Sequence, residues 1–484
     1  MLAPGVPSYN IGMAWRIEGA LDEARFAAAI DEVAQSHDAL RLVIDIDIDE
    51  AAGVPYQHVV PRAGCIVPVL DLTGYADAED RAWAHIRRVA STSFALHGRP
   101  LWEAQLVRIA PERWLWRLHF HHLVSDGTHF AIVARAIAEA YEGRAGSDAP
   151  SYLEFVDKDR LYLASPRYAE DRAFWTERFA ALPPPLLAPG ALEAMANGRE
   201  AWISDRALRR IEGPELARLR AYLAASGGTL QHFLLALLAV YFARTHGVDE
   251  VVIGVSVHNR GTARDRRTAG MFSSMIPLGI RVDRARSFAE LMQSVAAELR
   301  RCYRHQRFPI QDLNRALRLE QLGRHQLFDV TLSLDIYPEV TPIGAARWAV
   351  VDKMYSGFHQ VPLAVCINEY PGADHAIIEL DHSRAAFARS EIEQIQRRLA
   401  WMMSAVVADD RQPIGALAML DEAERRQVVE VWNATDVAYP AGGSVHGLIE
   451  AQVARTPEAI AVDDGAQRLS YAALDARATR LAHG

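Results

Sequence analysis

The chain has 484 residues, which is enough for several domains or for one domain with extensions. Half of the residues are hydrophobic and 23% are charged, an ordinary globular composition with ample apolar material for a core. The formal net charge of −9 at pH 7 gives no reason to expect a nucleic-acid partner.

Three further features predict a cytoplasmic protein without a membrane partner. The longest apolar run, Phe233–Ala243, is far shorter than the roughly 20 residues that a membrane span needs. The cysteines Cys65, Cys302 and Cys366 are scattered without a CxxC pair, as expected for a reducing compartment. The first residues also lack the basic segment of a signal peptide.

The first part of the chain predicts alternating strands and helices. Ile11–Ile17 alternates as a strand, and apolar side chains then recur at helical spacing from Leu21 to Val33. A second strand is expected at Leu40–Asp45. Further strands are expected near 55–61 and 66–71, followed by a helix over about 77–93.

A single run, Trp114–Tyr141, combines a strand, a short loop and an amphipathic helix. Strand alternation places His119 and His121 on one face and His122 on the other. A buried strand that delivers a histidine to the start of a helix is suited to acid–base chemistry, because backbone N–H groups and a titratable imidazole meet there. The structural alternative is a histidine cluster in the core, followed by an ordinary turn.

The proline-rich segment Pro183–Pro189 cannot continue a helix and is predicted to cross between two lobes. Thr229 is positioned to cap the apolar run and Gly247 to end it, which predicts a buried helix. The expected elements of the second lobe are a strand near 199–205, helices over about 214–225 and 229–245, strands at 251–260, 327–337 and 375–381, and a helix over about 390–408. After residue 420 the chain changes to a charged helix and an irregular strip.

The spacing His121-His122-x-x-x-Asp126-Gly127 resembles the signature of the condensation domains of nonribosomal peptide synthetases, which belong to the chloramphenicol-acetyltransferase-like superfamily. Further segments resemble motifs of that family in the same order: 36–41, 151–155, 171–175, 251–260, 270–278, 305–310 and 327–337. The family's first N-terminal motif is missing. Beyond residue 420 the chain resembles the linker to an adenylation domain and the opening of that domain.

The resemblance implies an α/β fold with two chloramphenicol-acetyltransferase-like lobes, arranged as a V-shaped pseudo-dimer with an active-site tunnel between them. The N-terminal lobe is expected at 1–182 and the C-terminal lobe at 183–420. A linker is expected at 421–445 and an N-terminal fragment of an adenylation domain at 446–484. The phosphate-binding loop and catalytic lysine of an adenylation domain would lie downstream, so no ATP chemistry is expected.

The resemblance also implies an acyl transfer that forms an amide, in which the amine of an aminoacyl group on a carrier protein attacks a donor thioester. It assigns His122 to the attacking amine, either as general base or as a group that orients the amine. Gly127 is expected to let the substrate approach the backbone, with its N–H at the oxyanion. His121 is expected to support the loop from below. Asp126 is expected to form a structural ion pair with Arg260, which lowers its pKa and makes it a poor proton acceptor.

Four positions depart from the residues that are common in the family or follow its motif directly: Thr128, His129, Ser274 and Asp335. We expect them to line the substrate channel. No metal site is expected, because strand alternation separates the histidines that would have to converge on one ion.

No covalently bound cofactor is expected, and the phosphopantetheine arm of the carrier protein and acyl-CoA would act as substrates. The expected partners are a peptidyl or aminoacyl carrier protein, the adjacent adenylation domain and an acyl-CoA donor. If Met1 is the native start, a starter domain that transfers a fatty acyl group to the first aminoacyl carrier is the leading subtype. The alternatives are an elongation domain with a peptidyl-carrier donor and a non-catalytic domain that only docks a partner.

Overall fold

The computed structural model describes residues 5–46, 55–62, 64, 66–144, 149–187, 199–337, 341–370, 373–438 and 443–484. The chain divides into two compact units, Met1–Met419 and Leu420–Gly484. Cys65 and part of the predicted crossing at Pro183–Pro189 lie outside the described residues.

The larger unit contains two six-stranded sheets. The first sheet has the order β11-β12-β1-β6-β5-β4, and its neighbours are antiparallel except for the parallel pair β4 and β5. Its strands are β1 (Asn10–Glu18), β4 (Val69–Asp71), β5 (Trp102–Ala110), β6 (Arg113–His121), β11 (Thr341–Ile343) and β12 (Ala346–Met354). A separate hairpin of β2 (Leu42–Ile46) and β3 (Pro55–Val59) lies outside this sheet.

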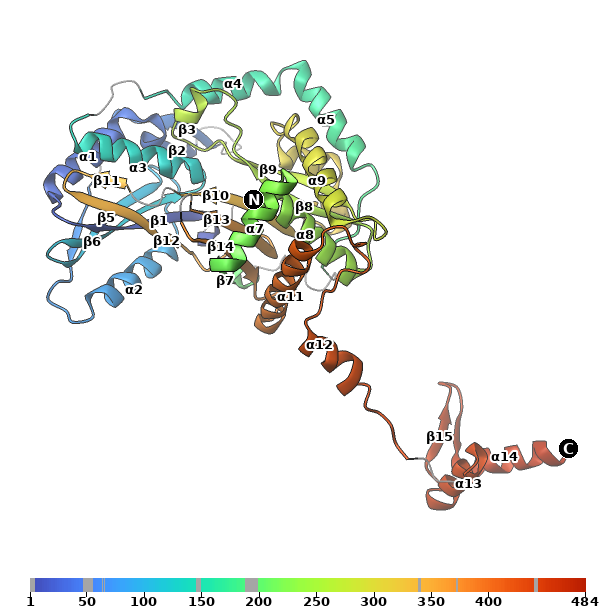
Figure 1. The fold of residues 1–484 in the computed structure, drawn as a ribbon. Coiled ribbons are helices and arrows are strands. Elements are labelled where there is room, and N and C mark those ends of the chain that lie inside the picture. Colours follow the sequence, from blue (N-terminus) through green and yellow to red (C-terminus); the bar gives the residue numbers. More distant parts are fainter. Residues whose placement is uncertain are drawn as a thin grey trace. The chain divides into compact units, whose positions relative to one another are not determined.

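Both faces of the first sheet are covered by helices (Figure 1). On one face, α1 (Glu23–Ser36) and α3 (Gly127–Tyr141) pack over an aromatic core in which Trp15 stacks on Trp116 at 4.3 Å between ring centroids. On the other face, α2 (Ala78–Ala90) packs with its small and aliphatic side chains. The alternating side chains of β1 and β6 are therefore buried on both sides.

The second sheet has the order β7-β14-β13-β10-β8-β9. The central pairs β13–β10 and β10–β8 are parallel, and the outer pairs are antiparallel. Its strands are β7 (Ser204–Glu212), β8 (Glu250–Val257), β9 (Ser274–Arg281), β10 (Val330–Ile336), β13 (Leu363–Glu369) and β14 (His375–Ser383). The accompanying helices are α7 (Gly213–Ser226), α8 (Leu230–His246), α9 (Phe288–Tyr303), α10 (Ile310–Ala316) and α11 (Arg389–Ala408).

Helix α8 forms the centre of the second core, and its burial on all sides explains its continuous apolar sequence. The predicted caps are confirmed: the Thr229 side chain accepts from the backbone N–H of His232, and Gly247 adopts the left-handed conformation at φ 67°. Among the described helices, no single one is long and apolar enough to cross a membrane. The consecutive helices α7 and α8 reach that length only as a pair, with a bend of 99° between them.

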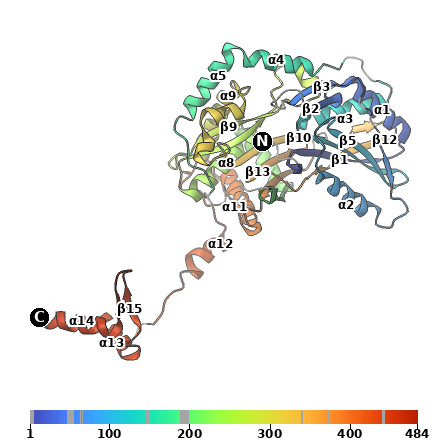
Figure 2. The same cartoon turned by 180° about the vertical axis from the view of Figure 1, so that it is seen from behind.

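Helices α4 (Leu153–Leu163) and α5 (Pro166–Arg178) run along the same edge of the larger unit, from the first sheet toward the second (Figures 1 and 2). The smaller unit, described by itself, contains the short helix α12 (Glu422–Arg426), the helices α13 (Val445–Arg455) and α14 (Tyr471–His483), and the hairpin of β15 (Ile460–Asp463) and β16 (Arg468–Ser470).

Five strands of the larger unit were not predicted: β5, β9, β11, β12 and β13. The strand expected near 199–205 begins at Ser204, because Arg199–Trp202 forms a short 3-10 turn. The unexpected strand β12 has the largest structural consequence. It comes from the second half of the chain, yet it pairs with β1 from Gly12↔Met354 to Glu18↔Arg347.

Candidate active site

Strand β6 ends at His121, and the ring of this residue supports the loop that follows. Its Nδ1 accepts a hydrogen bond from the backbone N–H of Leu123 at 3.2 Å, and its ring lies 5.7 Å from that of Tyr9. Burial lowers the pKa of His121 to about 4, so the ring is neutral and can accept this bond. The His121 ring is thus hydrogen-bonded to the backbone of the loop.

His122 is the first residue after the strand and is half-buried. Its backbone N–H donates to the carbonyl oxygen of Tyr9 at 2.8 Å, which ties the loop to the start of β1. Among the described residues, the buried Nδ1 of His122 has no hydrogen-bond partner. The imidazole of His122, half-buried at the end of the strand and held by its backbone, is a group suited to exchange a proton with a substrate.

Asp126 organises the end of the loop. Its Oδ1 accepts the backbone N–H of His129 at 2.9 Å and caps helix α3. Its Oδ2 accepts Nη1 of Arg260 at 2.7 Å and the backbone N–H of Phe272 at 2.9 Å. Burial alone would raise the pKa of this carboxyl, but the Arg260 charge and these hydrogen bonds outweigh it and hold the pKa below its ordinary value. Asp126 is therefore an ionised carboxylate held by its hydrogen bonds and ion pair, and it is a poor proton acceptor.

Arg260 completes this support from the second half of the chain. The side chains of Arg260 and Asp126 are only 1% and 2% exposed. The guanidinium also donates from Nη2 to the carbonyl oxygen of Gly270 at 3.1 Å and lies 4.1 Å from the ring centroid of Phe272. One ion pair thus joins the loop after β6 to the segment between β8 and β9.

Gly127 is exposed and opens helix α3. As the first helical residue it has a backbone N–H without an acceptor inside the helix, and the positive end of the helix dipole lies at this point. This N–H is free to stabilise negative charge on a substrate oxygen. A methyl group built on its Cα would lie 3.3 Å from Oδ1 of Asp335, so the start of α3 lies close to β10 of the second sheet.

The remaining predicted positions differ in their surroundings. Thr128 and Ser274 are half-buried, and Ser274 opens β9 beside the segment that contacts Asp126. His129 is fully buried against Phe120, with 4.7 Å between the ring centroids. The structure thus brings Thr128, Ser274 and Asp335 toward the loop, whereas the His129 ring points into the core.

Comparison with known proteins gives a consistent result. The sequence model of the condensation domain matches residues 1–429. The chain belongs to the condensation domain family. Condensation domains are acyltransferases that form amide bonds in nonribosomal peptide synthesis, so the predicted family and enzyme class are confirmed.

Two curated relatives illustrate the match of this condensation domain. Tyrocidine synthase 3 of Brevibacillus parabrevis is 28% identical over 477 residues, which cover 98% of this chain and 7% of that protein. The dimodular nonribosomal peptide synthase of Bacillus subtilis (strain 168) is 25% identical over 503 residues, which cover 99% of this chain and 20% of that protein. The chain therefore spans a fifth or less of the length of these relatives.

Solved structures confirm the predicted two-lobed α/β fold. The starter condensation domain of rhizomide synthetase, in a complex with C8-CoA, has a TM-score of 0.74 and 27% sequence identity, with 86% of this chain and 94% of that chain covered. The first condensation domain of the calcium-dependent antibiotic synthetase has a TM-score of 0.73 at 23% identity, with 86% and 95% covered, and supports the fold alone.

Sequence reasoning missed the residues that surround Asp335 in this condensation domain. Its Oδ2 accepts Nζ of Lys353 at 2.6 Å and the hydroxyl of Tyr337 at 3.0 Å, and the thiol of Cys366 lies 3.4 Å away. Lys353 belongs to β12 of the first sheet, whereas Asp335 belongs to β10 of the second. No local pattern predicts this cluster, because its members come from three separate strands and a loop.

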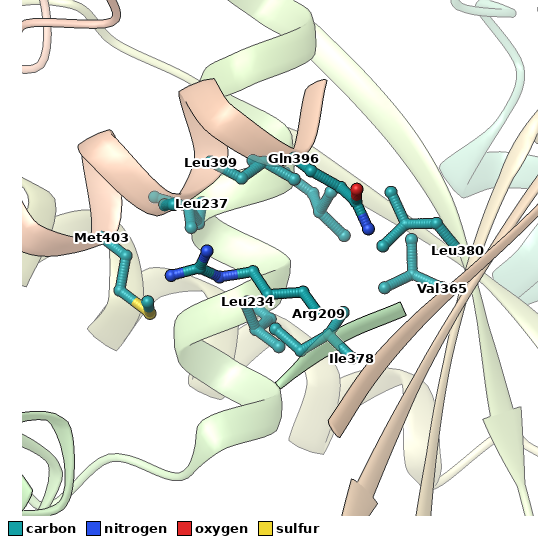
Figure 3. A pocket seen from close by; sticks show the side chains of 11 residues that line it. Arg209, Leu234, Leu237, Val365, Ile378, Leu380, Gln396, Leu399 and Met403 are labelled. Carbon is teal, nitrogen blue, oxygen red and sulfur yellow. The ribbon is translucent and has the colours of Figure 1, made fainter. Parts of the chain in front are cut away.

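An apolar pocket in the larger unit is separate from this loop. Figure 3 shows it between helices α8 and α11 and the second sheet, lined mainly by aliphatic side chains with Arg209 and Gln396 at its polar positions. None of the predicted site residues lines this pocket. Among the described residues, no group of three or more histidine, cysteine or acidic side chains is arranged to hold a metal ion.

Proposed function

We propose that this condensation domain transfers an acyl group from a fatty acyl-CoA to the amine of an aminoacyl group held on the phosphopantetheine arm of a carrier protein. The reaction forms an amide and releases the CoA thiol. In this proposal the domain initiates a lipopeptide. An adenylation domain that follows residue 445 loads the amino acid onto the carrier protein.

The observation that carries this proposal is the loop from His122 to Gly127. The half-buried His122 opens this loop, with its Nδ1 buried and unpaired among the described residues, and the exposed residue Gly127 places a backbone N–H at the start of a helix. A group that takes or orients the ammonium proton and a donor for the oxyanion are the two elements that aminolysis of a thioester needs. The buried pair of Asp126 and Arg260 holds them in place.

The fatty acyl-CoA donor is supported by the likeness to the starter condensation domain of rhizomide synthetase, whose structure holds C8-CoA. The experiment uses the full chain, an aminoacyl-loaded carrier protein, and a series of acyl-CoA thioesters from acetyl to palmitoyl. Mass spectrometry of the carrier protein detects the N-acyl product. A parallel reaction supplies a peptidyl-loaded carrier as donor. Product only in that parallel reaction would replace the starter assignment with the elongation assignment, and no product in either would favour a docking role.

His122 is the residue whose replacement tests the proposed chemistry directly. Replacing His122 by Ala is expected to lower the rate of amide formation about 10²–10⁴-fold, because general acid–base groups contribute at that level. The matched control is His97→Ala, since His97 is exposed and lies outside the loop. Far-ultraviolet circular dichroism checks that both variants are folded. Equal rates in the two variants would remove His122 from the chemistry.

A further inference from the structure

The cluster around Asp335 contains a carboxylate that is only partly satisfied. Among the described residues, the hydrogen bonds that Asp335 accepts from Lys353, Tyr337 and Cys366 all go to Oδ2. The other oxygen, Oδ1, is the atom that a methyl group on Gly127 would approach to 3.3 Å. Asp335 therefore has one oxygen anchored in the protein and one directed at the exposed start of helix α3.

This position is reachable from solvent. The side chains of Asp335 and Lys353 retain 24% and 29% of their exposure although neighbouring strands surround them. Gly127 is exposed on the opposite side of the gap. A small polar group of a substrate that reaches Gly127 is thus within the range of Oδ1.

The charges of the cluster favour a cation. Burial alone would raise the pKa of Asp335, but the Lys353 ammonium outweighs it and lowers the pKa, so the carboxylate is ionised. Burial raises the pKa of the Cys366 thiol to about 12 and that of Tyr337 well above its ordinary value, so both groups are neutral. The ion pairs of the cluster join the carboxylates of Asp335, Glu379 and Asp381 to the cations of Lys353 and Arg206.

The cluster has one more carboxylate than it has cations, and this extra carboxylate is not neutralised elsewhere in the cluster. Glu379 is 6% exposed, and its Oε2 has no hydrogen-bond partner among the described residues. It lies 3.8 Å from Nζ of Lys353 and 3.5 Å from Nη2 of Arg206. Both cations are therefore shared between two carboxylates, which leaves Asp335 able to attract a further positive charge.

We propose that Oδ1 of Asp335 binds the primary ammonium group of the acceptor and positions it beside Gly127. This inference rests on the proposed function, because it assigns the acceptor subsite of that reaction. The ammonium has two sources: the α-amine that becomes the amide nitrogen, or a basic side chain of the acceptor amino acid. In the first case Asp335 positions the nucleophile, and in the second it selects the acceptor.

Binding measurements without turnover distinguish these two cases. They do not depend on amide formation, which the assay of the proposed function tests separately. The probes are pantetheine derivatives with a stable amide in place of the thioester, bearing leucyl, N-acetyl-leucyl, lysyl or Nα-acetyl-lysyl groups. Their dissociation constants are measured by calorimetry with the full chain. The variants are Asp335→Asn and, as a matched control, Asp374→Asn, because the Asp374 side chain is 88% exposed.

The two sources predict different outcomes. If Asp335 binds the α-ammonium, Asp335→Asn weakens the binding of the leucyl probe about 10-fold or more and leaves the binding of the N-acetyl-leucyl probe unchanged. If it binds a side-chain ammonium, Asp335→Asn weakens the binding of the two lysyl probes only. In both cases Asp374→Asn binds like the wild type.

The proposal is overturned if, in the wild type, neither the leucyl probe nor the Nα-acetyl-lysyl probe binds more tightly than the N-acetyl-leucyl probe, which has no ammonium. That comparison does not depend on the folding of any variant. It is also overturned if a folded Asp335→Asn variant binds every probe like Asp374→Asn. In turnover, a positioning role appears as a raised KM for the acceptor with a smaller change in kcat, which a general loss of structure would not produce.

Discussion

Asp126 shows how a single carboxylate can hold an active-site loop. It accepts hydrogen bonds from the backbone at His129, Phe272 and Ser273 and from the guanidinium of Arg260. Burying polar groups of this kind without hydrogen-bond partners costs free energy. The pair is therefore expected to matter for stability as well as for the geometry of the site.

Replacing Arg260 by Ala is expected to lower the free energy of unfolding by about 3–5 kcal/mol, because it leaves a buried carboxylate unpaired. The same loop offers a control. Arg264 pairs with Glu154, and both side chains are nearly half exposed. Arg264→Ala is expected to cost much less, because exposed ion pairs contribute little to stability. Urea denaturation measures both, and equal losses would contradict the structural role of the buried pair.

Gly127 is the second residue whose replacement tests the site. Gly127→Ala is expected to lower kcat/KM by about 10²-fold, because the methyl group narrows the gap to Asp335 and displaces the substrate. Stability should change little, since alanine is a good helix former at this position. Gly74→Ala is the control, because a methyl group there meets no atom within 4 Å. A Gly127→Ala enzyme with full activity would contradict a close approach of the substrate.

At the scale of elements, β6 and α3 carry three buried histidines whose rings are neutral. Burial lowers the pKa of His119 to about 3, of His121 to about 4 and of His129 to about 3. The unfolded chain binds these protons near pH 6.5, well above the folded values. The stabilisation from the neutral rings is therefore complete above about pH 6.5 and is lost as the pH falls toward the folded pKa values.

The free energy of unfolding is accordingly expected to fall on acidification from about pH 6 to pH 4, with each buried histidine contributing about 1.4 kcal/mol per pH unit. His129→Phe should reduce this slope by the contribution of one histidine, because the His129 ring is fully buried against Phe120. His97→Phe, at an exposed position, is the matched control. Urea midpoints across this range provide the measurement, and identical slopes for both variants would contradict a neutral buried His129.

At the scale of the whole molecule, β12 joins the two sheets. The strand follows β10 of the second sheet in the chain but lies in the first sheet beside β1. Its Trp348 stacks on Trp116 with 5.0 Å between ring centroids, and its Lys353 reaches Asp335 of the second sheet. The approach of β10 to Gly127 therefore depends on a strand from the other half of the sequence.

Trp348→Ala is expected to lower the free energy of unfolding by about 3–5 kcal/mol, because it removes a large side chain from the aromatic core of the first sheet. Trp401 on α11 is the control, since it is 42% exposed and should cost much less when replaced by Ala. Chemical denaturation followed by circular dichroism compares the two variants. Similar losses would argue against a shared core for the two halves of the chain.

Local features of the sequence determined several elements of the fold and the position of the active-site loop. Hydrophobic periodicity predicted β6, α3 and α8, because burial of one face or of all faces leaves a regular apolar pattern. The spacing from His121 to Gly127 identified the condensation domain family and located the loop. The tertiary structure decided what depends on remote partners: that β12 returns to the first sheet, that His129 points into the core, and that Asp335 meets both Lys353 and Gly127. Periodicity records which side chains are buried but not which strand or side chain lies against them, so these contacts exist only in the folded chain.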